Sequence, residues 1–84
     1  MFDMQKIGRQ ISSLRKKKGM TQMELADALG ISYQAVSNWE RGNTMPDISK
    51  LPELAEIFGV SIEEILCDER KGKIAEEMSE GKMP

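Results

Sequence analysis

The stretch TQMELADALGISYQAVSNWERG, residues 21–42, decides the fold of this chain. Thr21 and Glu24 have the spacing of a capping box, in which each side chain accepts a hydrogen bond from the backbone N–H of the other residue. This spacing predicts a helix that starts directly after Thr21 and ends at Gly30. Ser32 follows closely and is a favourable N-cap residue. A second helix is therefore expected to begin directly after it.

The connection between these two helices determines how they cross. Only Gly30 and Ile31 separate their cap regions. Short helices joined by a turn of three or four residues that contains glycine cross steeply, which is the helix-turn-helix arrangement. The apolar residues expected to face inward are Met23, Leu25, Ala26 and Leu29 in the first helix, and Ala35, Val36 and Trp39 in the second.

The second helix of this pair has an unusual outward surface. Its outward residues are Tyr33, Gln34, Ser37, Asn38 and Arg41. They include no Glu–Lys pair, and most of them carry amide or hydroxyl groups, which donate and accept hydrogen bonds at once. Such groups suit the reading of base edges, since Gln or Asn can bind adenine N6 and N7 together. The alternative is that Gln34 and Asn38 are ordinary solvent-facing amides.

Apolar residues at helical spacing predict three further helices around this pair. The three stripes are Met4, Ile7, Ile11 and Leu14; Leu51, Leu54, Ala55 and Phe58; and Val60, Ile62, Ile65 and Leu66. Gly19 ends the first stripe and Gly59 the second. Pro52 is tolerated only in a first turn, so we expect a short separate turn over residues 47–51 and a regular helix from about Leu51. A second capping box at residues 61–64 opens the last helix, and the whole is an all-α bundle of five helices.

The last part of the chain, residues 68–84, lacks such a stripe. It contains nine charged residues, and its apolar side chains are Ile74, Ala75, Met78 and Met83. This composition predicts a charged, loosely ordered tail beside a domain of residues 1–67. Three of the apolar residues share one helical face, so a short helix that docks on a protein partner or a second subunit is the alternative.

Length and composition exclude several classes of protein. A chain of 84 residues forms one small domain, which excludes a multidomain enzyme. Histidine is absent and Cys67 is the single cysteine, so the chain lacks the residues for a structural zinc site, a histidine base or a Ser-His-Asp triad. We therefore expect no catalytic residue, no metal and no cofactor. No apolar stretch approaches the length of a membrane span, and no secretory signal is evident, which predicts a cytoplasmic protein.

The net charge of −2 conceals a polarised distribution. Residues 1–42 carry a net charge of +3 and residues 43–84 a net charge of −5. A polyanion would approach the first half and be repelled by the second. The basic cluster of residues 15–18 has a second interpretation, because cations in the last turn of a helix also stabilise the negative end of its dipole.

Taken together, these segments resemble a known family. The matching residues are Ile7-Gly8-Arg9, Leu14-Arg15, Gly19-Met20-Thr21-Gln22, Glu24-Leu25-Ala26, Gly30-Ile31-Ser32, Val36-Ser37-Asn38-Trp39-Glu40-Arg41-Gly42, Pro46, Leu51, Leu54-Ala55, Phe58-Gly59-Val60 and Glu64-Ile65-Leu66. In this order and spacing they resemble the Cro/C1-type (Xre family) helix-turn-helix domain of phage and bacterial repressors. The resemblance covers residues 5–67. It implies a five-helix, lambda-repressor-like DNA-binding domain, in which the helix after Ser32 lies in the major groove.

The resemblance also implies which residues contact bases. The family's base-reading positions fall on Tyr33, Gln34, Ser37 and Asn38. Tyr33 departs from the glutamine or small polar residue of better known repressors, and three roles remain open for it. It can touch a thymine methyl group, stack along the sugar-phosphate backbone or cover Leu29.

Contacts to phosphate are implied at a second set of residues. The family's positions fall on Gln22, Ser32 and Asn43. A helix N-terminus presents free amides and the positive end of a dipole to a phosphate, which supports Gln22 independently. Further phosphate ligands are expected among the basic residues Arg9, Lys17 and Arg41, and Lys50 is a weaker candidate.

A structural ion pair is implied between Arg15 and Glu40. It explains why an acidic residue occurs at position 40, on a helix that is expected to approach phosphates. We expect this pair to be partly buried and hydrogen-bonded.

These features predict a sequence-specific, DNA-binding transcriptional regulator, namely a repressor that binds a palindromic operator as a homodimer. One recognition helix covers too few base pairs for specificity, and a dimer places two such helices about 34 Å apart. The same domain occurs in antitoxins, whose tail would bind a toxin, and in restriction-system controllers. A protein-protein adaptor without DNA binding is the alternative from another class.

Overall fold

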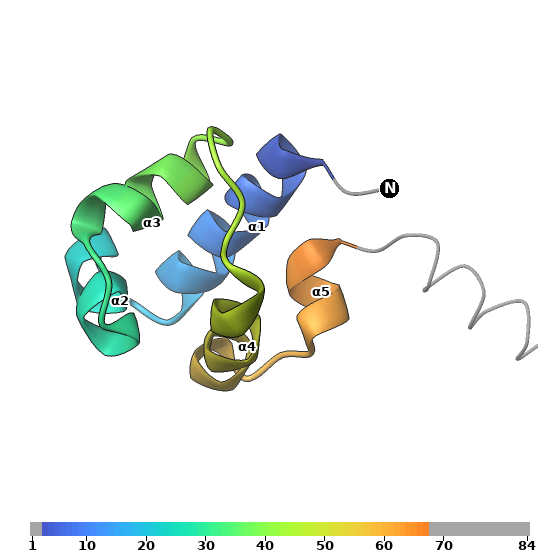
Figure 1. Cartoon of the computed structure of the whole chain (residues 1–84). Helices are drawn as coiled ribbons and strands as arrows, with labels where there is room; N and C mark the ends of the chain where they lie inside the picture. Colours follow the sequence, from blue (N-terminus) through green and yellow to red (C-terminus); the bar gives the residue numbers. More distant parts are fainter. Residues whose placement is uncertain (1–2, 68–84) are drawn as a thin grey trace, which may run out of the picture.

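A computed structural model describes residues 3–67 of the protein, and all secondary-structure elements of the described part are helices (Figure 1). Its elements are α1 (Met4–Lys17), α2 (Gln22–Leu29), α3 (Tyr33–Glu40), the 3₁₀ turn η1 (Ile48–Lys50), α4 (Leu51–Phe58) and α5 (Ile62–Leu66). The five expected helices are all present, and η1 is the short turn expected before α4. The predicted tail, with its alternative docking helix, lies outside the described residues.

Local capping determines where the two central helices begin. Thr21 Oγ1 accepts from the N–H of Glu24 at 3.0 Å, and Glu24 Oε1 accepts from the N–H of Thr21 at 2.9 Å. Ser32 Oγ accepts from the N–H of Ala35 at 3.1 Å and so caps α3. Gly30 has a φ of +69°, a left-handed conformation that glycine adopts without strain, and it ends α2. Both helices therefore begin where the sequence predicts, and α2 also ends where it predicts.

One core joins all five α-helices. The side chains with relative exposure of 1% or less are Ile7, Ile11, Leu25, Ala26, Val36, Leu54 and Ile65. Val36 and the 5%-exposed Trp39 anchor α3 to this core. No helix among residues 3–67 is both long enough and apolar enough to cross a membrane.

Two methionines assigned to the apolar stripes are exposed instead. Met23 is 54% exposed, because it lies about 200° around α2 from Leu25 and so leaves the face that packs on the core. Gln22 lies on that inward face instead. Met4 is 42% exposed and is the first residue of α1.

Helices α1 and α3 approach each other closely at Gly8. A Cβ atom at this position would overlap the carbonyl oxygen of Trp39 and would lie 3.0 Å from the carbonyl oxygen of Glu40. Because both obstacles are backbone atoms, a side chain could be admitted only by moving the helices apart. Gly8 is therefore required for the close packing of α1 on the last turn of α3.

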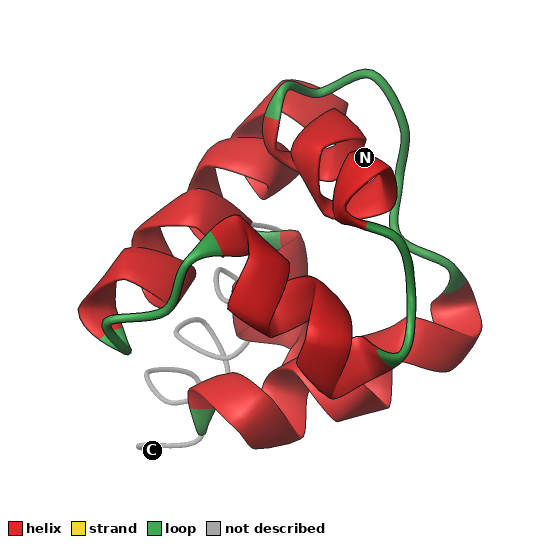
Figure 2. Cartoon of the chain, turned by 90° about the vertical axis from the view of Figure 1, so that its left-hand side faces the viewer, coloured by secondary structure: helices red, strands yellow, loops and turns green. Residues whose placement is uncertain are grey.

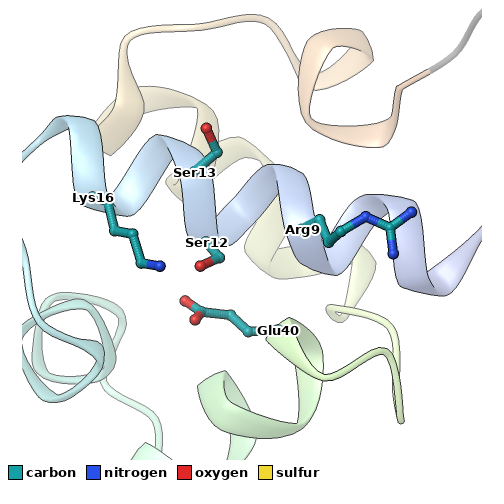
Figure 3. Close-up of a pocket in the computed structure, with 5 residues that line it drawn as sticks. All are labelled: Arg9, Ser12, Ser13, Lys16 and Glu40. Carbon is teal, nitrogen blue, oxygen red and sulfur yellow. The ribbon is translucent and has the colours of Figure 1, made fainter.

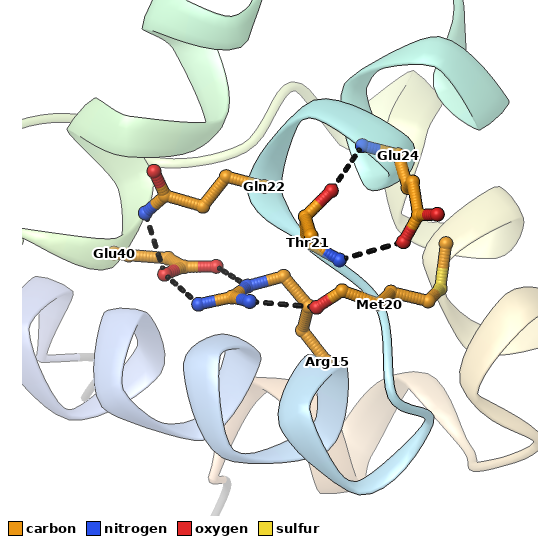
Figure 4. Close-up of polar contacts among 6 residues, drawn as sticks. All are labelled: Arg15, Met20, Thr21, Gln22, Glu24 and Glu40. Atoms are coloured by element: carbon orange, nitrogen blue, oxygen red, sulfur yellow. Dashed lines mark hydrogen bonds and ion pairs between the residues drawn. The ribbon is translucent and has the colours of Figure 1, made fainter.

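The predicted pair between Arg15 and Glu40 forms beside this contact (Figure 4). Arg15 Nε donates to Glu40 Oε2 at 2.7 Å, and Arg15 Nη2 donates to Glu40 Oε1 at 3.0 Å. Arg15 Nη1 also donates to the carbonyl oxygen of Met20 at 2.7 Å, and Gln22 Nε2 donates to Glu40 Oε1 at 2.9 Å. The hydrogen bond to Glu40 is the main cause that raises the pKa of Arg15 above its ordinary value. The two charged side chains are 11% and 6% exposed, so the pair ties α1, α2 and α3 together away from solvent.

Replacing Gly8 by alanine should destabilise the fold by about 1 to 3 kcal/mol, the usual cost of overpacking a close contact. Urea unfolding followed by circular dichroism measures this change. Ser13→Ala is the matched control, since Ser13 is exposed on the same helix and its replacement should change stability by no more than about 0.5 kcal/mol. Equal stability of the two variants would contradict the assigned role of Gly8.

Alanine at either Arg15 or Glu40 should lower the free energy of unfolding by about 1 to 3 kcal/mol, because the remaining charge loses its buried partner. Lys16→Ala removes an exposed cation from the adjacent position and serves as the control. The double variant should cost less than the sum of the two single variants, since no unpaired charge is left. Additive effects would show that the two residues do not act as a pair.

Candidate nucleic-acid interface

The outward face of α3 presents the four residues proposed as base readers. Tyr33 is 47% exposed, Gln34 is also exposed, and Ser37 and Asn38 are half-buried one turn further along the helix. The spacing of one turn places all four on one side of α3, opposite Val36. Figure 2 views the molecule from the side on which α2 and α3 lie, where both helices are at the surface. The structure therefore brings polar groups together on one exposed helix face.

Asn38 is hydrogen-bonded to two of the residues proposed to contact phosphate. Arg41 Nη2 donates to Asn38 Oδ1 at 3.0 Å, and Asn43 Nδ2 donates to the same oxygen at 3.5 Å. Arg41 and Asn43 are exposed and lie directly after α3. At the C-terminal end of α3, two side-chain donors therefore lie around the amide oxygen of Asn38.

The start of α2 provides a different kind of contact. Gln22 is the first residue of this helix and is half-buried. Its Nε2 group donates to Glu40 Oε1, so its side chain is held between α2 and the end of α3 (Figure 4). The first turn of a helix also has backbone N–H groups without intrahelical partners, and these are directed toward an approaching anion. Ser32 has a related position, at the N-cap of α3.

Two of the basic residues proposed as phosphate ligands lie on α1. Arg9 lines an open pocket of about 400 Å³ together with Ser12, Ser13, Lys16 and Glu40 (Figure 3). Its guanidinium group points away from the Glu40 carboxylate in this view. Lys17 is exposed in the last turn of α1. Lys16 is a further cation on this side of α1, because its spacing of seven residues from Arg9 places both on one face of the helix.

Lys50 has a structural role that its position in the sequence does not indicate. Its Nζ group donates to the carbonyl oxygen of Leu29 at 3.0 Å, and Glu53 Oε2 lies 3.7 Å away. The last carbonyl groups of a helix lack intrahelical partners, and Lys50 satisfies one of them at the end of α2. Lys50 therefore supports the helix-turn-helix unit, and its suggested contact to phosphate stays a prediction.

Comparison with known proteins agrees with this geometry. The chain matches the Helix-turn-helix family over residues 11–65. It is 38% identical over 63 residues to the uncharacterized HTH-type transcriptional regulator YazB of Bacillus subtilis (strain 168), covering 75% of this chain and 91% of YazB. Two longer relatives are a transcriptional activator from Enterococcus faecalis and a transcriptional regulator from Escherichia coli (strain K12). The chain spans only 32% of the length of the first and 35% of the length of the second.

Two solved structures are similar in both sequence and fold. The P22 c2 repressor, in complex with a synthetic operator, is 33% identical with a TM-score of 0.68, covering 71% of this chain and 91% of that chain. The restriction-modification controller protein C.AhdI from Aeromonas hydrophila is 28% identical with a TM-score of 0.69, covering 75% of this chain and 96% of that chain. The protein therefore belongs to the Cro/C1-type (Xre) helix-turn-helix family of DNA-binding transcriptional regulators, which is not a family of enzymes.

Proposed function

We propose that this regulator is a cytoplasmic repressor that binds a palindromic operator as a homodimer, with α3 in the major groove. The observation that carries the proposal is the exposed face of α3. It presents amide and hydroxyl groups from Tyr33, Gln34, Ser37 and Asn38, while Val36 and Trp39 fix the opposite face in the core. A rigid helix with hydrogen-bonding groups on its surface meets the requirement for reading bases in the major groove.

Contacts to the DNA backbone would position this helix. The proposed phosphate ligands are Gln22, Ser32, Asn43, Arg9, Lys17 and Arg41. Four exposed acidic residues, Glu53, Glu56, Glu63 and Glu64, lie instead on α4 and α5, away from α3 (Figure 1). This separation of charge would orient the molecule as it approaches DNA.

Glu40 is compatible with this position because its charge is compensated. It lies in the last turn of α3, where an unpaired carboxylate would repel phosphate. The two hydrogen bonds from Arg15 and the third from Gln22 neutralise and cover it. The α3 surface can therefore approach a polyanion even though an acidic residue lies beside it.

A restriction-system controller is the second candidate function. The observation in its favour is the similarity to C.AhdI, which extends over 96% of that chain. Both functions use the same contacts to DNA, so they are distinguished by the gene neighbourhood. A restriction or methyltransferase gene beside the coding sequence would favour the controller, and an inverted repeat upstream of the gene would favour an autoregulated repressor.

Binding to duplex DNA should weaken as salt increases, because each phosphate contact releases condensed counterions. The logarithm of the association constant should fall with the logarithm of salt concentration by about 0.9 per phosphate contacted. Lys17→Gln should reduce this slope by about 1. Lys50→Gln removes the same charge but from a residue bonded to Leu29, so it should leave the slope unchanged. Fluorescence anisotropy across a salt series measures the slope for each protein. Salt-independent binding of the unaltered protein would instead favour a protein-protein adaptor without DNA binding.

Alanine substitution should affect DNA binding differently at residues that read bases and at residues that contact phosphates. Gln34→Ala and Asn38→Ala should each cost about 1 to 3 kcal/mol on the specific operator and leave binding to random DNA nearly unchanged. Gln22→Ala should weaken binding to both kinds of DNA. Because Gln22 also bonds to Glu40, thermal unfolding must confirm that this variant is folded at the assay temperature. Identical behaviour of the three variants on operator and random DNA would refute the assignment of α3 as the reading helix.

A further inference from the structure

The hydrogen bond between Arg41 and Asn38 restricts how Asn38 can read a base. The guanidinium group of arginine only donates hydrogen bonds, so the asparagine atom 3.0 Å from Arg41 Nη2 must be the acceptor Oδ1. The reversed amide would place two donors against each other. Asn43 Nδ2 approaches the same oxygen at 3.5 Å. Arg41 thus occupies one lone pair of Oδ1 with a short hydrogen bond, and Asn43 lies at the outer limit of hydrogen-bond distance from the same oxygen.

The other end of this amide is left with donor capacity only. Within residues 3–67, no acceptor is bonded to the Nδ2 group of Asn38. Asn38 lies on the same face of α3 as Gln34 and Ser37, and it is half-buried beside the exposed Arg41. A base in front of α3 would therefore meet an NH₂ group, with the carbonyl oxygen already occupied.

The major-groove edges of the bases respond differently to such a group. Guanine presents two adjacent acceptors, N7 and O6. Adenine presents one acceptor, N7, beside the N6 amino donor, and an asparagine that binds both atoms must use its oxygen as well as its nitrogen. Against a donor-only asparagine the adenine N6 group would lose its partner, and a desolvated polar group without a partner is costly.

We propose that Arg41 is a specificity-determining positioning residue, which holds Asn38 Oδ1 and thereby makes Asn38 select guanine over adenine at the base pair it contacts. This inference rests on the proposed function, since it concerns how α3 reads DNA. It differs from the adenine contact that an isolated asparagine on this helix would favour.

Arg41 can keep this role while the protein is bound to DNA. The bond to Asn38 uses the Nη2 group, and the other N–H groups of the guanidinium remain available to a phosphate. Asn38 and Arg41 are three residues apart, a spacing at which side chains of one helical turn meet without distortion. Phosphate binding and the orientation of Asn38 therefore do not compete.

The test is selection of binding sites from a randomised duplex library by four proteins: the unaltered chain, Asn38→Ala, Arg41→Ala and Lys17→Ala. The position at which Asn38→Ala loses base preference identifies the base pair that Asn38 contacts. The unaltered chain should prefer guanine there by at least about fivefold over adenine. Arg41→Ala removes the short hydrogen bond and leaves Oδ1 with only the 3.5 Å contact from Asn43, so it should shift the guanine-to-adenine ratio at this position toward adenine by a similar factor.

Lys17→Ala is the matched control, because it removes one cation and a proposed phosphate contact without touching Asn38. It should bind more weakly and keep the guanine-to-adenine ratio unchanged. Adenine preference in the unaltered chain, an unchanged ratio in Arg41→Ala or no altered position in Asn38→Ala would each overturn the inference while leaving sequence-specific binding intact. Recovery of only random sequences by the unaltered chain would overturn the proposed function itself, and this inference with it.

Discussion

The hydrogen-bonded ion pair between Arg15 and Glu40 connects the three helices on which the recognition surface depends. Arg15 extends from α1 and spans the carboxylate of α3 and the Met20 carbonyl group, directly before α2 begins. Gln22, at the start of α2, completes the arrangement by donating to the same carboxylate. A buried charge left without its partner would be strongly destabilising, so these contacts form together. The pair thus stabilises the angle between α2 and α3 and neutralises an acidic group at the edge of the proposed DNA-binding surface.

This arrangement requires α1 to lie unusually close to the end of α3. Gly8 permits that approach, because it places no side chain against the carbonyl groups of Trp39 and Glu40. On the other side of the same turn, Trp39 enters the core. Packing and electrostatics therefore act on one turn of α3, which is held firmly while the preceding turns expose their polar face. A recognition helix that is rigid in this way loses little conformational freedom when it binds DNA.

The exposed face of α3 was predictable because it depends on neighbouring residues alone. A helix capped by Ser32 whose only large apolar side chains are Val36 and Trp39 must present its other residues outward. The expectation that Met23 faces inward is wrong, because its angle around α2 turns this apolar side chain away from the core. Local reasoning also could not show that Lys50 binds the last carbonyl group of α2, because Leu29 lies 21 positions earlier in the chain.

The amino-acid sequence by itself determined the helix boundaries and the outward residues of α3, since caps, glycine stops and apolar spacing act within a few residues. Through its resemblance to a known family, it also indicated the pairing of Arg15 with Glu40. Only the tertiary structure decided the hydrogen bond from Gln22 to Glu40 and the hydrogen bond from Lys50 to the carbonyl oxygen of Leu29. The physical reason is that a hydrogen bond requires an atom to be placed within a fraction of an ångström. Such placement follows from how the helices pack and which rotamers that packing allows, and residue spacing along the chain does not specify it.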